Sequence, residues 1–189
     1  MMIAAASAGA ATPAGAATAG ATSVVNGTIA AVNGDSVTVT ASDGHRTTAK
    51  IAPDTLIVSR GPATLGMIKP GDPLAVTAKR EADGALRAVS IKIFSPALWA
   101  GVRKGQWTMQ SGTIMTDALV AQVVERVEGR TLYMKLDQGT GTINVPSGTQ
   151  IYRLETVGVA ALKTGMHVRV RKTAEPDGTT KASSIVFDR

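Results

Sequence analysis

The sequence has no cysteine, only two histidines and only six aromatic residues among 189. The lack of cysteine excludes a disulfide framework, a thiol nucleophile and cysteine-based zinc or iron–sulfur sites. His45 and His167 are too few to form a histidine-rich metal centre. None of the short motifs of serine hydrolases, P-loop nucleotide-binding proteins, zinc proteases or EF-hands occurs. We therefore expect no catalytic, cofactor-binding or metal-binding residues and no enzymatic activity.

The positive charge of the chain is spread along its length. The net charge of +6 divides into +2 for residues 27–94 (eight basic, six acidic), +1 for 95–121 (two basic, one acidic) and +3 for 122–189 (ten basic, seven acidic). A nucleic-acid-binding protein would show a dense basic stripe and aromatic side chains for base stacking. This distribution makes nucleic acid an unlikely partner.

Residues 1–23 contain eleven alanines and no charged residue. Pro13 and Gly15 interrupt this stretch too early for a membrane span, which needs about 20 strongly apolar residues. A short apolar start followed by small residues is typical of a signal peptide, although the usual basic stretch is missing. We interpret residues 1–23 as an Ala-rich signal remnant, or alternatively a flexible tail, and expect a periplasmic or extracellular protein.

The remaining sequence repeats itself. Residues 27–39 align with 122–134 at an offset of 95, and from residue 51 onward the offset is 94. Identical pairs at the second offset include Thr55/Thr149, Val76/Val170 and Ile91/Ile185. Such a register predicts two copies of one domain. We place the first copy at 24–94, a connector at 95–121 and the second copy at 122–189.

Each copy shows the same order of elements. Three alternating apolar and polar stretches separated by Gly-containing turns predict three strands, for example at 29–32, 37–41 and 47–51. One or two helical turns follow near 62–68 and 156–162, and two more strands close each copy. This order predicts an all-β fold of two tandem five-stranded Greek-key barrels of OB type, each with one short helix between strands 3 and 4. A β-sandwich is the alternative.

A family resemblance agrees with this fold. The first copy has a G-x-I-x-x-V-x-G opening at Gly27, a T-x-I at Thr55, a Lys69-Pro70-Gly71-Asp72 turn and a closing D-G-x-x-x-A-x-x-I from Asp83. This pattern resembles the bacterial domain of unknown function DUF5666, and the second copy is similar but has Met166 in place of the usual Asp. The resemblance implies an OB-like barrel and an exported protein, and it implies no known catalytic activity.

The second copy has a cluster of aromatic and basic residues that the first copy lacks. If the outward positions of its strands form one face, that face could bind an anionic polymer or a glycan by stacking and charge. The alternative is a solvated face with the two tyrosines packed on the neighbouring copy. The candidate residues are Tyr133, Lys135, Tyr152, Arg153, Arg169 and Arg171.

The connector has both tryptophans of the chain, Trp99 and Trp107, with Arg103 between them. Exposing tryptophan is costly, so we expect the two rings to pack on a barrel. The alternative is an interface for a protein partner or another copy of the chain. The stretch from 113 to 124 could begin the first strand of the second copy early, or add a strand to another molecule.

These observations lead to one preferred function and two alternatives. We expect an exported, non-enzymatic tandem barrel protein with a binding or structural role in the periplasm or cell envelope. The first alternative is a module that binds polyanions or glycans through the second copy. The second is a self-assembling envelope or fibre protein that oligomerises through its connector.

Overall fold

The computed structural model describes residues 20–126 and 129–189 and confirms the predicted all-β class. The short helices are α1 (Pro96–Trp99) and two 3-10 turns, η1 (Leu65–Met67) and η2 (Val159–Ala161). The two 3-10 turns occur at the two positions where the sequence predicts a short helix. The strands are β1 (Thr22–Asn33), β2 (Ser36–Ala41), β3 (Arg46–Pro62), β4 (Pro73–Arg80), β5 (Leu86–Phe94), β6 (Gly105–Thr108), β7 (Ile114–Arg126), β8 (Gly129–Leu136), β9 (Gly139–Pro146), β10 (Gln150–Thr156), β11 (His167–Ala174) and β12 (Thr180–Asp188).

Five strands from the two ends of the chain close into one barrel, which we call the terminal barrel. Its strands pair in the ring β1–β2–β3–β12–β11–β1, with β3 and β12 parallel and all other pairs antiparallel. This is the strand order of an OB-type barrel. Because side chains alternate along a strand, Val37 and Val39 of β2 point into the core while Thr38 and Thr40 point outward.

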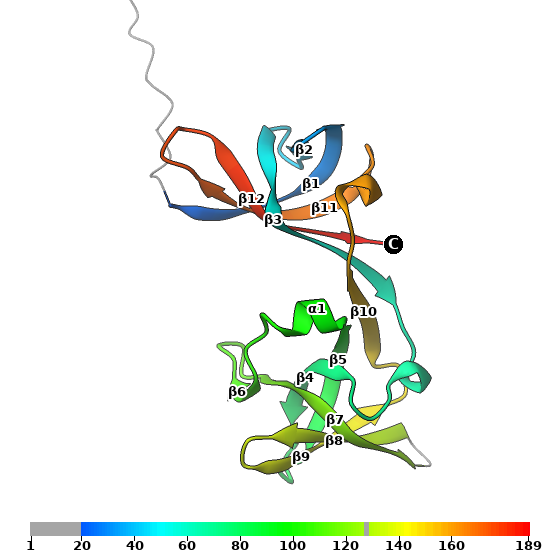
Figure 1. Ribbon diagram of the computed structural model, residues 1–189. Helices are drawn as coiled ribbons and strands as arrows, with labels where there is room; N and C mark the ends of the chain where they lie inside the picture. The colour runs from blue at the N-terminus through cyan, green and yellow to red at the C-terminus, as the bar shows by residue number, and fades with distance from the viewer. Residues whose placement is uncertain (1–19, 127–128) are drawn as a thin grey trace, which may run out of the picture.

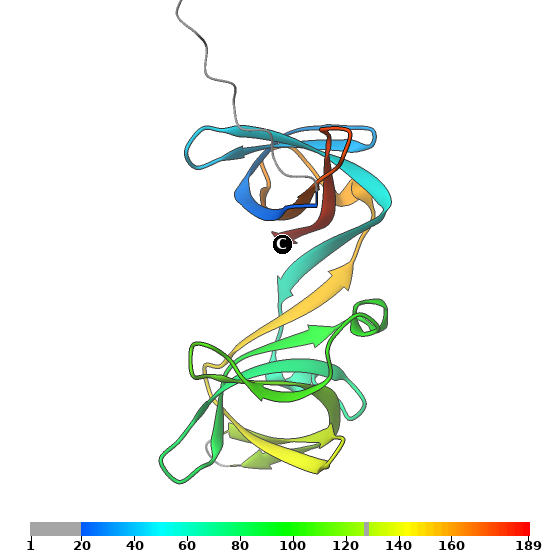
Figure 2. The same cartoon turned by 90° about the vertical axis from the view of Figure 1, so that its left-hand side faces the viewer.

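Strands from the middle of the chain form the second unit, which we call the central barrel. Its strands pair side by side in the order β5–β4–β7–β8–β9. A bridge between Arg87 of β5 and Asn144 of β9 closes this row of strands into a ring. Strand β10 continues from β9 and pairs in parallel with β5. Figure 1 shows the two barrels one above the other, and Figure 2 shows the same arrangement from the side.

The strands of each sequence copy are divided between the two barrels. The first copy gives β1–β3 to the terminal barrel and β4–β5 to the central barrel, while the second copy gives β7–β10 to the central barrel and β11–β12 to the terminal barrel. We had expected each copy, 24–94 and 122–189, to fold into its own barrel. The structure instead exchanges the last two strands between the copies.

Two strands cross between the barrels and pair with each other. The end of β3 runs antiparallel to β10, and Arg60 lies directly opposite Leu154 (Figure 2). Since 60 + 94 = 154, each of these residues faces its own repeat equivalent, so the pairing is centred on the symmetry of the repeat. The exchange therefore adds an antiparallel ladder of five residue pairs that two separate barrels would lack.

The two hydrophobic cores are each built from both copies. The terminal core joins Ile29, Val37 and Ile57 of the first copy to Val170 and Ile185 of the second. The 3-10 turns close the cores, because Val159 and Ala161 of η2 pack on the terminal core and Leu65 of η1 packs on the central core. The central core consists of Ile68, Leu74, Val76, Ala78, Leu86, Ala88, Ile91, Ile93, Ile114, Ala118, Val120, Leu132, Met134, Ile143, Val145 and Ile151.

The repeat register in the first strand differs from the alignment of the sequence. Gly27 pairs with Val168, and Ala118 pairs with Leu74. Leu74 and Val168 are 94 residues apart, so Gly27 corresponds to Ala118 at an offset of 91 rather than 95. The aligned Val127 lies outside the described residues. The reason is that the β7–β8 hairpin is four residues longer than the β1–β2 hairpin, and the sequence alignment had no gap to reveal it.

Candidate functional site

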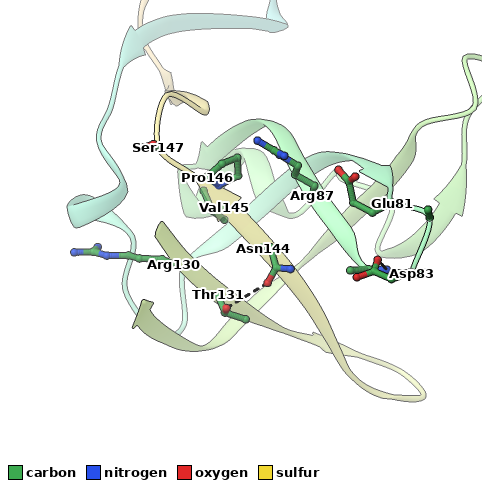
Figure 3. A pocket seen from close by; sticks show the side chains of 11 residues that line it. Glu81, Asp83, Arg87, Arg130, Thr131, Asn144, Val145, Pro146 and Ser147 are labelled. Carbon is green, nitrogen blue, oxygen red and sulfur yellow. Dashed lines mark hydrogen bonds between the residues drawn. The ribbon is translucent and has the colours of Figure 1, made fainter. Parts of the chain in front are cut away.

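A groove with a volume of about 860 Å³ lies at one end of the central barrel (Figure 3). The β4–β5 hairpin forms one side with Glu81, Asp83 and Arg87. The start of β8 and the end of β9 form the other side with Arg130, Thr131, Asn144, Val145, Pro146 and Ser147. Thr131 donates a hydrogen bond from Oγ1 to Asn144 Oδ1 at 3.4 Å, which ties the two strands across the groove wall.

The hairpin over this groove is held by its own side chains. The Asp83 carboxylate accepts a hydrogen bond from the Ala85 N–H at 2.9 Å, and Arg80 donates one to the Gly84 carbonyl at 2.9 Å. Asp-Gly is a turn-forming pair, because the aspartate caps nearby N–H groups and Gly84 adopts a positive φ of 86°. The loop is therefore fixed by local contacts and leaves Glu81 and Arg87 at the groove.

A smaller groove of about 430 Å³ occupies the corresponding end of the terminal barrel. Lys50 takes the place of Asn144 (50 + 94), and Gly178 takes the place of Gly84 in the equivalent hairpin (84 + 94). The groove is lined by Asp35, Ser36, Thr48, Lys50, Gly178, Thr179 and Thr180. Each groove thus combines a hairpin from one copy with strand ends from the other copy.

Most residues that line the two grooves have polar side chains, and none of them is aromatic. The central groove has two carboxylates, Glu81 and Asp83, and two guanidinium groups, Arg87 and Arg130. Without an aromatic ring, neither groove can bind a base or a sugar ring by stacking. The chemistry present suits a ligand that is recognised by hydrogen bonds and by charges of both signs.

The six residues predicted as a binding face lie in three different places. Tyr133 and Lys135 are on β8 of the central barrel, whereas Arg169 and Arg171 are on β11 of the terminal barrel. The strand exchange separates them, because strands 2 and 4 of the second copy belong to different barrels. The structure therefore does not bring these four side chains together as one surface.

The other two predicted residues lie on the crossing strand β10. The Arg60 guanidinium lies 4.9 Å from the centre of the Tyr152 ring, and the Tyr152 hydroxyl donates a hydrogen bond to Gln150 Oε1 at 3.2 Å. Arg153 is half-buried on the same strand, and its Nε has no hydrogen-bond partner among the described residues. Tyr152 thus contacts the strand from the other copy.

The connector residues lie against the central barrel beside cations. Trp99 of α1 is half-buried, with its ring 6.0 Å from the Phe94 ring and the Lys104 ammonium 5.6 Å above it. Trp107 of β6 is also half-buried, with the Arg103 guanidinium 4.4 Å from its ring. Each tryptophan is therefore stacked with a cation, which leaves only part of each ring exposed.

Beneath the connector lies a buried carboxylate that the sequence did not single out. Asp117 is only 8% exposed, pairs in register with Gly105 of β6, and its Oδ1 has no hydrogen-bond partner among the described residues. Burial raises the pKa of Asp117 to about 6, and the positive charges of Lys92 and Arg103 counteract part of that rise. In the sequence, Asp117 is the one charged residue in the otherwise largely apolar stretch 114–120, and this is the only feature of the sequence that could have indicated a buried carboxylate.

Metal-binding clusters and membrane-spanning helices are both absent from the described residues. In residues 20–126 and 129–189, no three acidic or histidine side chains come together to hold a metal ion. No helix in that part of the chain is long and apolar enough to cross a membrane.

Comparison with known families gives a match that covers the first copy. Residues 26–92 match the family described as Domain of unknown function (DUF5666), so the predicted resemblance is confirmed over the first copy. No curated protein and no solved structure matches the chain. The matched segment ends within β5, so it takes in strands that belong to both barrels.

Proposed function

We propose that this protein is an exported, non-enzymatic binding protein of the periplasm or cell envelope, with its two barrel-end grooves as the ligand-binding positions. The observation that carries the proposal is the recurrence of a polar groove at equivalent ends of both barrels. OB-type barrels bind ligands on the outer face of strands 2 and 3 and on the loops that flank this face. Here those elements are β8, β9 and the β4–β5 hairpin in the central barrel.

Several features support the separate parts of this proposal. The uncharged Ala-rich stretch of residues 1–23 supports export, and the lack of cysteine agrees with it. The absence of any nucleophile–base motif in the sequence supports a non-enzymatic role. The mixed charges of the central groove favour a polar ligand with both acidic and basic groups.

The binding part is tested with insoluble peptidoglycan, whose sugars and stem peptides present hydroxyl, carboxylate and amine groups. Full-length protein is sedimented with it, as wild type and as a variant with Arg87→Ala and Lys50→Ala, which removes one cation from each groove. The bound fraction should fall at least five-fold in this variant and stay unchanged in the control Lys135→Ala, which alters β8 outside the grooves.

Three results would contradict the proposal or a part of it. Equal sedimentation of the wild type and the groove variant would exclude the grooves as the ligand-binding positions. Strong heparin retention that is lost with Arg169→Ala and Arg171→Ala would favour the polyanion-binding alternative instead. Turnover of a substrate by the purified protein, abolished by one polar substitution, would overturn the non-enzymatic part.

Export has its own test. Cells producing the full chain are fractionated, and the N-terminal residue of the recovered protein is determined by mass spectrometry. The proposal predicts a periplasmic or extracellular protein cleaved after a small residue within 1–23. An uncleaved chain found only in the cytoplasm would contradict it.

A further inference from the structure

The first five residues of β1 have an open edge. Thr22 to Asn26 pair with β11 on one side, and β2 begins to pair on the other side only at Gly27. In the central barrel the corresponding edge of β7 is covered by β6. At the offset of 91, Val24 corresponds to Met115 and Asn26 corresponds to Asp117. In the central barrel, Met115 pairs with Trp107 of β6 and Asp117 pairs with Gly105 of β6. The central barrel therefore shows what completes this edge: one short antiparallel strand.

The backbone groups of this edge point away from the barrel. The Ala174 N–H donates to the Ala21 carbonyl, and the Gly165 N–H donates to the Ile29 carbonyl, so the odd-numbered residues of β1 bond toward β11 and its preceding loop. Because ladder hydrogen bonds alternate along a strand, Val24 and Asn26 direct their N–H and C=O groups to the open side. No described residue bonds to them there.

Among residues 20–126 and 129–189, none of the features that normally block strand addition is found at this edge. Exposed edge strands are usually protected by charged residues, proline, a bulge or a covering segment. Residues 22–26 read Thr-Ser-Val-Val-Asn, without charge or proline, and the bulge of β1 lies further along, between Ile29 and Ala31. The Val24 side chain is 40% exposed. This segment is therefore open to pairing with another strand.

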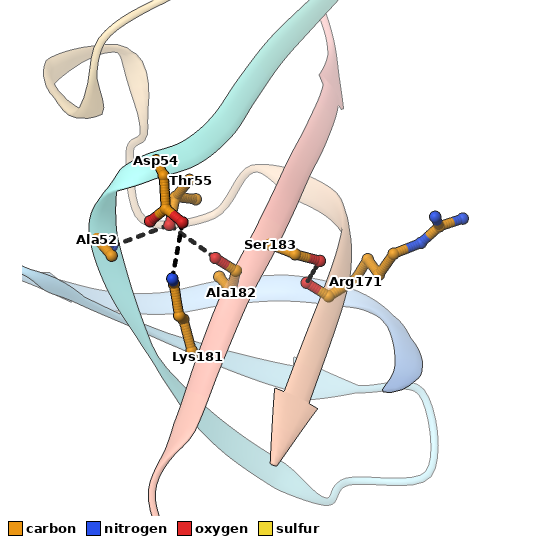
Figure 4. Close-up of polar contacts among 7 residues, drawn as sticks. All are labelled: Ala52, Asp54, Thr55, Arg171, Lys181, Ala182 and Ser183. Carbon is orange, nitrogen blue, oxygen red and sulfur yellow. Dashed lines mark hydrogen bonds and ion pairs between the residues drawn. The ribbon is translucent and has the colours of Figure 1, made fainter. Parts of the chain in front are cut away.

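The neighbouring strand gives this edge a positive charge. Arg171 lies opposite Val24 and Arg169 lies opposite Asn26, so all four side chains share the outer face of the barrel. Both arginines are exposed, and in the described part of the chain neither forms an ion pair. Figure 4 shows the Arg171 side chain extending away from the barrel. Two copies of this edge would bring these charges together, whereas an acidic strand would meet them favourably.

We propose that the open edge of β1 binds an extended acidic segment of a protein partner by β-strand addition. Its backbone pairs with Val24 and Asn26, a large apolar residue lies over Val24 as Trp107 lies opposite Met115, and its acidic residues contact Arg169 and Arg171. Main-chain hydrogen bonds supply affinity in this binding mode, and alternate side chains supply specificity. The site lies on the side of the terminal barrel and is independent of the two grooves.

The test uses a ten-residue fluorescent peptide in which Glu and Val alternate and Trp replaces one central Glu. Binding to the full-length protein is measured by fluorescence anisotropy. Control peptides have Lys in place of Glu, or a fully N-methylated backbone that cannot pair. Protein variants are Val24→Pro, which removes an edge N–H that the fold does not use, and Arg169→Glu with Arg171→Glu, which reverses the charge. Lys79→Glu with Lys135→Glu, two exposed lysines that line neither groove, is the matched charge control on the central barrel.

The proposal predicts a Kd for the acidic peptide that rises at least tenfold in Val24→Pro and in the double arginine variant, and stays unchanged in the matched control. The Lys peptide should gain affinity for the charge-reversed variant, and the N-methylated peptide should not bind. If Val24→Pro lowers the melting temperature, its loss of binding could reflect unfolding. The Arg169→Glu, Arg171→Glu variant, whose backbone is unaltered, then tests the proposal on its own. Hydrogen exchange should show fast exchange of the Val24 and Asn26 amides that slows with peptide.

Four results would overturn the proposal: no binding of the acidic peptide, equal binding of the N-methylated peptide, unchanged affinity in both edge variants, or protection of the Val24 and Asn26 amides without peptide. Protection independent of protein concentration would assign the edge to residues of the same chain. Protection that grows with concentration would assign it to a second copy.

Discussion

At the scale of single residues, Gly27 of β1 lies where the backbones of β1 and β2 approach each other closely. A Cβ atom at this position would lie 2.2 Å from the Thr40 carbonyl oxygen of β2, so only glycine allows the two strands to approach. At Gly61 on the crossing part of β3, a Cβ atom would meet nothing within 4 Å, and φ is not positive.

Gly27→Ala should therefore destabilise the protein by about 1–3 kcal/mol. The added methyl group would clash with the backbone of β2 at Thr40, and the backbone of a paired strand cannot move aside as a flexible side chain can. Gly61→Ala should leave the unfolding free energy unchanged or raise it by about 0.4–1 kcal/mol. Urea unfolding followed by circular dichroism measures both. A Gly27→Ala protein as stable as the wild type would show that β1 and β2 lie further apart than in this structure.

Asp117 makes stability depend on pH. Its pKa is about 6 in the folded protein against 3.8 for an unperturbed aspartate, so the folded state binds a proton more readily than the unfolded state. The stability due to this group is complete below pH 3.8 and is lost as pH rises through 6. Asp117→Asn removes the cost of burying the charge.

The variant should be more stable than the wild type by on the order of 2–3 kcal/mol at pH 8, with the difference vanishing near pH 4. Denaturant unfolding at pH 4, 6 and 8 measures this difference. The substitution Asp137→Asn, in the β8–β9 turn, is the control and should show no such trend. A wild type that gains stability between pH 4 and 8 relative to Asp117→Asn would contradict the burial of Asp117.

At the scale of elements, the strand exchange determines which core residues are neighbours. Ile57 of β3 pairs with Ile185 of β12, and Ile151 of β10 pairs with Ile91 of β5. Both pairs join one copy to the other. If each copy formed its own barrel, Ile57 would instead lie beside Ile91, since 185 − 94 = 91.

Double-mutant cycles with Ile→Val substitutions distinguish these arrangements. We predict a coupling free energy of about 0.5–1 kcal/mol for Ile57 with Ile185, since contacting residues couple. Ile57 with Ile91 should be additive within about 0.3 kcal/mol, since they lie in different cores. Coupling in the second pair and additivity in the first would show that each copy folds on itself.

The elements themselves could largely be predicted from the sequence, but their partners could not. Alternating residues such as Val168-Arg169-Val170-Arg171 predict strands, and Gly-containing turns predict where they end. The exchange is invisible because Val76/Val170 and Ile91/Ile185 are identical, so strands of either copy fill either core equally well. The predicted binding face failed to assemble for the same reason, since it assumed that strands 2 and 4 of one copy belong to the same barrel.

At the scale of the whole molecule, the two barrels are joined by more than a linker. Each core takes strands from both copies, and the crossing strands pair with each other. At the crossing strands, Arg60 of β3 forms an ion pair with Asp188 of β12, and Arg189 forms one with Glu155 of β10. Losing the strands of one copy would remove part of both cores.

We therefore predict that both barrels unfold in one cooperative transition. Ile185→Ala in the terminal core and Ile91→Ala in the central core remove fully buried side chains and should each cost about 2–5 kcal/mol. Both variants should shift the same single transition in calorimetry, with calorimetric and van't Hoff enthalpies in agreement. Two separate transitions, with each variant shifting only one, would contradict this prediction.

The exchange of strands between the two copies is tested most directly by a disulfide, because the natural chain has no cysteine to interfere. Asn26 of β1 and Arg169 of β11 are cross-strand partners from different copies, and both are exposed. They form a non-hydrogen-bonded pair, whose short Cα separation suits a disulfide. Asn26→Cys with Arg169→Cys should oxidise completely in dilute monomer, while the control Asn26→Cys with Ala75→Cys, the pair that would be adjacent within one copy, should keep free thiols. A disulfide in the control and free thiols in the first variant would show that each copy forms its own barrel.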